Sequence, residues 1–128
     1  MEKKELNPYG LFFIGESIEV EMATFTEKNE HGLNDVLIKV TGHAAFDEGI
    51  DQQVFRYIAV PAGTGVDFKY EQDGHEYTRM LSRQAWGTWT FFELFLNNKT
   101  YKVYKDEVRS KDVRPLHLLT DSKKTKAA

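Results

Sequence analysis

Apolar and polar residues alternate in several short runs along the chain. Ile18, Val20, Met22 and Thr24 alternate with residues that include Glu19 and Glu21, and apolar side chains likewise occupy every second position of residues 36–41, with Lys39 between them. A third run, residues 54–60, is rich in β-branched and aromatic side chains and stops at Pro61. A period of two places successive side chains on opposite faces of a strand, so these runs predict half-buried β-strands.

Two further runs form a predicted hairpin around Asp73-Gly74. Residues 66–72 and 75–81 flank this dipeptide, which is favoured in two-residue turns because both of its residues tolerate positive φ. Closure by two residues pairs Gln72 with His75, Tyr70 with Tyr77 and Phe68 with Arg79.

A second hairpin is predicted around Asn97-Asn98, between residues 88–96 and 99–105. Closure by two residues sets Glu93 opposite Lys102 and matches apolar residues with apolar ones: Leu94 with Tyr101, Phe92 with Val103, and Phe91 with Tyr104. A three-residue loop would set Leu94 against a lysine, so the cross-strand pairs specify the register.

The remaining segments complete the predicted fold. Residues 79–86 are expected to turn helical, and residues 106–119 are expected to form a helical turn and then a last strand that stops at Pro115. The pattern predicts an all-β, mainly antiparallel fold: a small six- to eight-stranded barrel or sandwich with at most one or two short helical turns. An oligonucleotide-binding-like barrel is one such fold. Residues 1–10 read as a flexible lead-in, residues 11–119 as a single β domain, and residues 120–128 as a disordered basic tail.

Composition narrows the class of protein. A chain of 128 residues with 41% apolar and 29% charged residues fits one globular domain. It contains no cysteine, which excludes disulfides and thiolate metal sites. No apolar stretch is long enough for a signal peptide or a membrane span, so we expect a cytoplasmic protein.

Charge is unevenly distributed along the chain. Residues 1–53 contain eleven acidic and four basic residues, whereas residues 54–128 contain thirteen basic and nine acidic residues. A basic half could attract a polyanion. We expect instead that strands from both parts of the chain alternate in one sheet, so that acidic and basic residues are mixed on the surface of the folded protein.

The second hairpin has aromatic rings on both of its faces. One face carries Phe92, Leu94, Tyr101 and Val103, which suffices for a core. The other carries Trp89, Phe91, Phe95 and Tyr104 beside the Glu93–Lys102 pair. A sheet face so rich in aromatic rings is expected either to be covered by another part of the chain or to bind a partner or ligand. The C-terminal segment (Val113, Leu116, Leu118, Leu119) or a second sheet would cover it; otherwise a protein, stacked bases or an apolar ligand is expected there.

Catalytic signatures are mostly missing from the sequence. No phosphate-binding glycine loop, nucleophile elbow, zinc-protease motif or calcium loop is present, and no histidines stand at metal-ligand spacing. Glu93 among rings, with His43 or Arg56 nearby, could perform acid–base chemistry inside a barrel. An ion pair between Glu93 and Lys102, and a buried structural role for His43, explain the same residues more simply. We therefore expect no enzymatic activity, metal or cofactor.

The sequence thus favours a non-catalytic binding domain. Its most plausible partner is a protein, or a second copy of the chain, bound through Trp89, Phe91, Phe95, Tyr104 and Lys102. A single-stranded nucleic acid is the first alternative, because rings interleaved with basic residues can stack bases and contact phosphates. The net charge of −3 opposes that alternative. A barrel enzyme or small-ligand carrier with a cavity around Glu93 is the second alternative; no membrane partner is expected.

The Asp73-Gly74 turn yields a first testable prediction. The substitution Gly74→Val should lower the free energy of unfolding by more than ~1 kcal/mol, because a β-branched residue cannot adopt positive φ. Thermal unfolding measures the change. An unchanged melting temperature would mean that the turn lies elsewhere.

Overall fold

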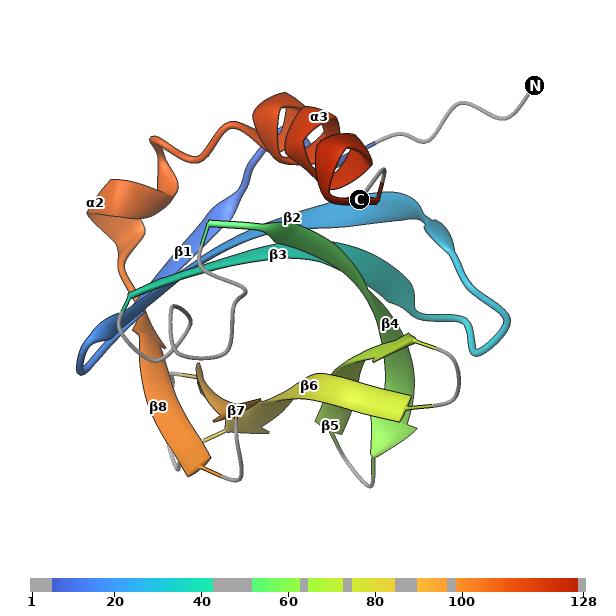
Figure 1. Ribbon diagram of the computed structural model, residues 1–128, viewed down its shortest axis with the longest axis horizontal. Helices are drawn as coiled ribbons and strands as arrows, with labels where there is room; N and C mark the ends of the chain where they lie inside the picture. The colour runs from blue at the N-terminus through green and yellow to red at the C-terminus, as the bar shows by residue number, and fades with distance from the viewer. Residues whose placement is uncertain are drawn as a thin grey trace.

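The computed structural model describes residues 6–42, 52–62, 65–72, 75–84, 90–96 and 99–126. Eight strands follow one another in chain order and close into a barrel, each pairing antiparallel with the next and β8 pairing back with β1 (Figure 1). The all-β antiparallel class predicted from the sequence is confirmed, and the architecture is a barrel. The Asp73-Gly74 turn lies outside the described residues.

The strands and helices have the following bounds. The strands are β1 (Leu11–Gly15), β2 (Ile18–Lys28), β3 (Asn34–Gly42), β4 (Val54–Ala62), β5 (Gly65–Gln72), β6 (His75–Gln84), β7 (Thr90–Leu96) and β8 (Lys99–Lys105). Two helices follow, α2 (Glu107–Ser110) and α3 (Pro115–Lys126). The predicted runs at residues 18–24, 36–41 and 54–60 fall within β2, β3 and β4.

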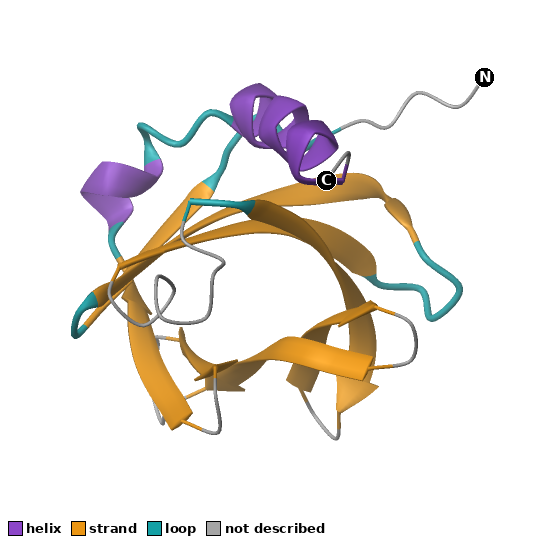
Figure 2. Ribbon diagram, viewed as in Figure 1, coloured by secondary structure: helices purple, strands orange, loops and turns teal. Residues whose placement is uncertain are grey.

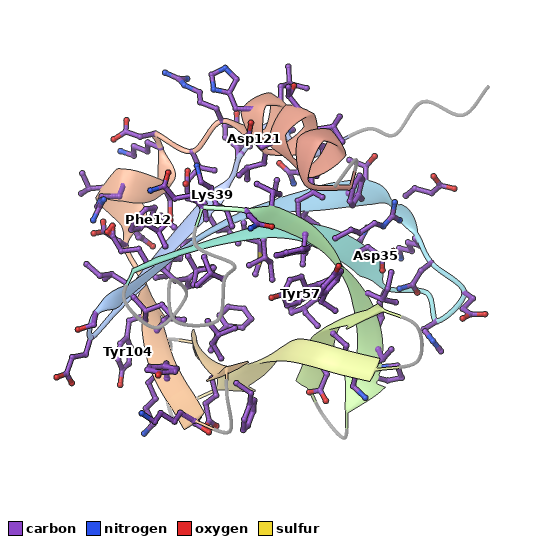
Figure 3. All side chains as sticks on the ribbon, viewed as in Figure 1. Phe12, Asp35, Lys39, Tyr57, Tyr104 and Asp121 are labelled. Carbon is purple, nitrogen blue, oxygen red and sulfur yellow. The ribbon has the colours of Figure 1, made fainter. Side chains whose placement is uncertain are left out.

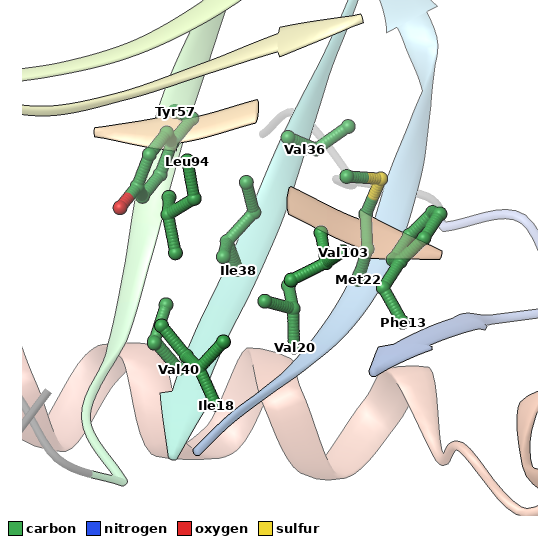
Figure 4. Close-up of a cluster of buried hydrophobic side chains, with 10 residues drawn as sticks. All are labelled: Phe13, Ile18, Val20, Met22, Val36, Ile38, Val40, Tyr57, Leu94 and Val103. Atoms are coloured by element: carbon green, nitrogen blue, oxygen red, sulfur yellow. The ribbon is translucent and has the colours of Figure 1, made fainter. Parts of the chain in front are cut away.

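The barrel interior is filled by the inward-facing residues of these strands. Alternate positions of β1 to β4 contribute most of a buried cluster, which Leu94 of β7 and Val103 of β8 complete (Figure 4). The cluster consists of Phe13, Ile18, Val20, Met22, Val36, Ile38, Val40, Tyr57, Leu94 and Val103, each at most 2% exposed. Period-two alternation therefore supplies the core, as the sequence pattern predicted.

A second apolar cluster lies on the outside of the barrel, beneath the helices. It joins outward-facing residues of β1 to β4 to the C-terminal segment: Phe12, Ala23, Phe25, Leu37, Val54, Val113 and Leu118. Figure 2 shows both helices on this side of the barrel. The first four strands are thus apolar on both faces, because each face is covered by another part of the chain.

Helix α2 is attached to β1 by hydrogen bonds at Phe12. The Ser110 hydroxyl accepts a hydrogen bond from the Phe12 N–H at 2.8 Å, and the Asp106 N–H donates to the Phe12 carbonyl at 2.8 Å. The Arg109 guanidinium lies 4.0 Å from the centre of the Phe12 ring and donates to Glu19 at 3.1 Å. These contacts hold the C-terminal segment against the β1–β2 wall.

The predicted register is confirmed in one hairpin and partly wrong in the other. All four predicted pairs of the β7–β8 hairpin are confirmed, including Glu93 opposite Lys102. In the β5–β6 hairpin Gln72 pairs with His75 as predicted, but the register shifts between Tyr70 and Glu71. Tyr70 therefore pairs with Thr78, and Phe68 with Met80. The predicted Tyr70–Tyr77 and Phe68–Arg79 pairs are wrong, because a bulge adds one residue to one strand.

Three other segments differ from the sequence-based expectation. Residues 79–84 continue β6 instead of turning helical, because they pair with β7 over their whole length. Pro115 begins helix α3 instead of ending a strand, which suits its fixed φ and missing N–H. That helix runs to Lys126, where a disordered tail from residue 120 was expected, and its buried Leu118 ties it to the barrel.

The lead-in is likewise attached from Leu6 onward. Leu6 forms a bridge with Phe25, and the Asn7 N–H donates to the Thr24 carbonyl at 2.8 Å. Residues 6–10 therefore run along β2.

One buried charged residue organises the wall of β3 and β4. The Asp35 carboxylate, 3% exposed, accepts hydrogen bonds from the Asn29 amide at 2.7 Å, the Arg56 guanidinium at 2.8 Å and the Ala59 N–H at 3.0 Å. Burial alone would raise the pKa of Asp35, but these hydrogen bonds and the Arg56 charge outweigh it and lower that pKa below its ordinary value.

This network predicts a pH-dependent contribution to stability. Because the pKa of Asp35 is lowered in the folded state, its ionised carboxylate contributes its full stabilisation above the ordinary pKa of about 3.9. That stabilisation is lost as pH falls through the folded-state pKa. Asp35→Ala should lower the free energy of unfolding at neutral pH by about 1.5–3 kcal/mol, because buried donors lose a charged acceptor.

Urea unfolding at neutral pH and below the ordinary carboxyl pKa measures both effects. Exposed Asp112 gives the control variant, Asp112→Ala. The account is contradicted if Asp35→Ala and Asp112→Ala destabilise the neutral protein equally.

Candidate functional site

Helix α3 lies against β2, β3 and β4, across the barrel from β7 and β8 (Figure 2). Val113 and Leu118, the residues expected to cover this face, are buried against β1 to β4 instead. Leu119 packs against that same outer cluster, and Leu116 is exposed. The apolar residues of the described C-terminal segment therefore pack elsewhere than on the β7–β8 hairpin.

Alternation along the two strands defines which residues lie on this face. Because Phe92, Leu94, Tyr101 and Val103 pack against the interior cluster, the residues between them point outward. We call Glu93, Phe95, Lys102 and Tyr104 the β7–β8 outer face. Tyr104 is 41% exposed, Lys102 is exposed and Phe95 is half-buried.

Two predicted binding residues cannot be placed in the same way. Trp89 lies outside the described residues. Phe91 is described in its backbone, which pairs with Tyr104. Of the five predicted binding residues, the structure therefore places Phe95, Lys102 and Tyr104 on one face, with Phe95 opposite Thr100 and so four residues along β8 from Tyr104.

A groove borders this face where β8 meets β1. It has a volume of about 550 Å³ and is lined by Ile14, Gly15, Glu16, Thr100, Tyr101, Lys102 and Tyr104. Ile14, 40% exposed, is the register partner of Tyr104, so two exposed apolar side chains stand side by side. We call this site the β1–β8 groove.

The groove lies where β1 ends beside β8 after a short pairing. The two strands pair at only two positions, Phe13 with Lys105 and Ile14 with Tyr104. At the end of β1, Gly15 approaches the Lys102 main chain so closely that a Cβ would collide with its carbonyl oxygen. The chain then turns into β2, and β8 continues beyond that turn.

Tyr101 connects the groove to the barrel interior. Its side chain packs against the interior cluster and also lines the groove. Sequence reasoning placed Tyr101 on the core face and missed the groove. The only sign of the groove in the sequence is the short apolar run at residues 11–14, and that run does not reveal which strand lies beside it.

The residues considered for enzymatic chemistry are not brought together. Glu93 lies on the outer face opposite Lys102, between the inward-facing Phe92 and Leu94. Arg56 lies on β4, pairs with Asp35 at 2.8 Å and stands 4.3 Å from the centre of the Phe25 ring. Strands β5 and β6 separate β4 from β7 in the sheet order. His43 lies outside the described residues.

The described residues contain no group of three or more His, Asp or Glu side chains placed to hold a metal ion. His31 hydrogen-bonds within its turn through its main chain, and His117 is exposed on α3. Within the same residues, no helix has the length and apolar character needed to cross a membrane.

Comparison with family models, with curated proteins and with solved structures finds no match to this chain. The proposals below therefore rest on the geometry of the β7–β8 outer face and its groove.

The Glu93–Lys102 pair yields a prediction for this face. The two residues face each other across the strands and are partly open to solvent, so their coupling should be only ~0.2–1 kcal/mol. A double-mutant cycle to alanine, followed by urea unfolding, measures it. A coupling near zero, together with loss of an enzymatic activity in Glu93→Ala, would instead support the catalytic alternative.

Proposed function

We propose that this protein is a non-catalytic binding domain that recognises a protein partner through the β7–β8 outer face and the β1–β8 groove. One observation carries the proposal. The C-terminal helix that could have covered the rings of β8 packs on the opposite wall, and Tyr104 and Ile14 stay exposed beside a groove. Figure 3 shows Tyr104 at β8, away from Asp121 of α3.

The chemistry of the site suits a protein surface. Tyrosine is enriched among the residues that dominate binding energy, because it buries a large ring at a small cost in side-chain entropy. Tyr104 supplies such a ring, and the groove beside it can accept an apolar side chain. Lys102 adds a charge to the face, and charged residues guide association more than they add affinity.

A single-stranded nucleic acid is a weaker candidate for the same face. Its affinity would depend on neutralising phosphates, whereas Glu16 lines the groove and Glu93 shares the outer face with Lys102. The overall charge of −3 opposes a polyanion as well.

A catalytic or carrier role around Glu93 lacks support, since that carboxylate points away from the interior cluster. We retain the cytoplasm as the proposed location.

The proposal predicts that Tyr104→Ala weakens partner binding sharply. Losing a central ring should cost at least ~2 kcal/mol, about thirtyfold in affinity. The measurement is quantitative affinity capture from a lysate of the source organism with wild type, Tyr104→Ala and Tyr9→Ala. Tyr9 is 82% exposed and lies outside the face, so it provides a matched control.

We expect one protein to be enriched by wild type and by Tyr9→Ala, and lost with Tyr104→Ala. Equal capture by all three proteins would contradict the proposed site. A parallel titration with a mixed-sequence oligonucleotide tests the alternative: tight binding that falls steeply with added salt would favour nucleic acid.

A further inference from the structure

We propose that the chain binds a free α-amino acid in a charged pocket on the outer side of β2 and β3, beside α2. The pocket has a volume of about 380 Å³, which is within the range of small-molecule sites. Five charged side chains line it: Glu19, Glu21, Lys39, Arg109 and Asp112. We call this site the β2–β3 pocket. It lies on other strands than the β7–β8 outer face, so it does not depend on the proposed function.

The pocket lies where two neighbouring strands change from apolar to charged on their outer side. The register pair Ala23–Leu37 is buried in the outer cluster beneath the helices. Two residues further along each strand, the pair is Glu21–Lys39, and Glu19 is the next residue of β2 on the same side. The charged side chains therefore begin where the apolar cluster ends, and the segment that contains α2 borders them.

Arg109 reaches this pocket with hydrogen-bond donors to spare. Its guanidinium lies 4.0 Å from the centre of the Phe12 ring and donates from Nη2 to the Glu19 carboxylate at 3.1 Å. A guanidinium has several N–H donors, and within the described residues no second acceptor takes a bond from this one. The ring and the ion pair thus hold a guanidinium at the pocket wall that can still bind a carboxylate.

Two further charges of the pocket lack a close partner. The Lys39 side chain is 23% exposed, and its ammonium nitrogen lies 3.9 Å from the Glu21 carboxylate, too far for a hydrogen bond. Figure 3 shows Lys39 and Phe12 on the side of the barrel that carries α2. Within the described part of the chain, the Asp112 carboxylate has neither an ion pair nor a hydrogen bond. The pocket therefore offers cationic donors and an anionic acceptor to one ligand.

The balance of charge determines the class of that ligand. Among the described lining residues, three carboxylates accompany two cations, so a simple anion would be repelled. A simple cation would leave the donors of Arg109 and Lys39 unused. The carboxylate of an α-amino acid can accept hydrogen bonds from these donors, and its ammonium group can donate to Asp112. Phe12 and Val113, the apolar residues of the pocket, favour an apolar side chain on the amino acid.

The experiment measures thermal unfolding of the full chain with each of the standard L-amino acids, L-leucine among them. We expect an apolar amino acid to raise the melting temperature, because binding to the folded state stabilises it. Calorimetric titration then compares that amino acid with its N-acetyl derivative, which lacks the ammonium group, and with its amide, which lacks the carboxylate. Both derivatives should bind at least about tenfold more weakly, as expected when a charged group loses its hydrogen-bond partner.

Two substitutions test the pocket residues themselves. Lys39→Met and Asp112→Asn each remove one charge and keep a side chain of similar size, and each should weaken binding at least about tenfold. Lys28→Met and Glu30→Gln are the matched controls. They change exposed residues at the other end of the β2–β3 hairpin and should leave binding unchanged.

Several outcomes would overturn the amino-acid site. Equally tight binding of the amide would indicate a cation site, and equally tight binding of the N-acetyl derivative would indicate an anion site. Absence of any stabilising amino acid, or binding that Lys39→Met and Asp112→Asn leave unchanged, would contradict the proposal as well. None of these results alters the test of the proposed function, which depends on Tyr104.

Discussion

The junction between β1 and β8 closes the barrel with only two register pairs, Phe13 with Lys105 and Ile14 with Tyr104. Closure matters because it removes the open edges that a curved sheet would otherwise expose along its first and last strands. Here closure is achieved over part of β8 only. One half of that strand completes the barrel, and the other half extends beyond the β1–β2 turn and borders the groove. The candidate site therefore follows from the short pairing between the two strands that meet.

The distribution of apolar residues accounts for the side on which that site lies. The first four strands are apolar on both faces, since outward-facing Phe25 and Leu37 must also be buried. Helix α3 buries these residues, and it therefore packs on the outside of β1 to β4. Nothing in the described C-terminal segment remains to cover the β7–β8 outer face, so Tyr104 stays exposed. Burial on one wall thus leaves Tyr104 exposed on the other.

Local pairing was predictable where the sequence contains an unambiguous pair. Glu93 and Lys102 fix the β7–β8 register because any slip would set a charge against an apolar residue. The bulge after Tyr70 carries no comparable signal, and the predicted β5–β6 pairs failed there. The run Leu116 to Leu119 is too short to distinguish a strand from a helix by its period, and Pro115 can end one or begin the other. Tyr104 and Lys102 could be proposed as site residues from alternation alone. Ile14 and the groove could not, because they depend on a contact between the two ends of the barrel.

The central claim is that the β7–β8 outer face is open in the isolated chain, and tyrosine acetylation tests it most directly. The protein is treated at a dilution that excludes self-association, and each site is quantified by mass spectrometry. The account predicts that Tyr104, 41% exposed, is acetylated in the folded protein, as is Tyr9, whereas the fully buried Tyr57 is protected until the chain unfolds. Protection of Tyr104 to the same degree as Tyr57 would show that the chain covers this face itself, and would contradict the proposed site.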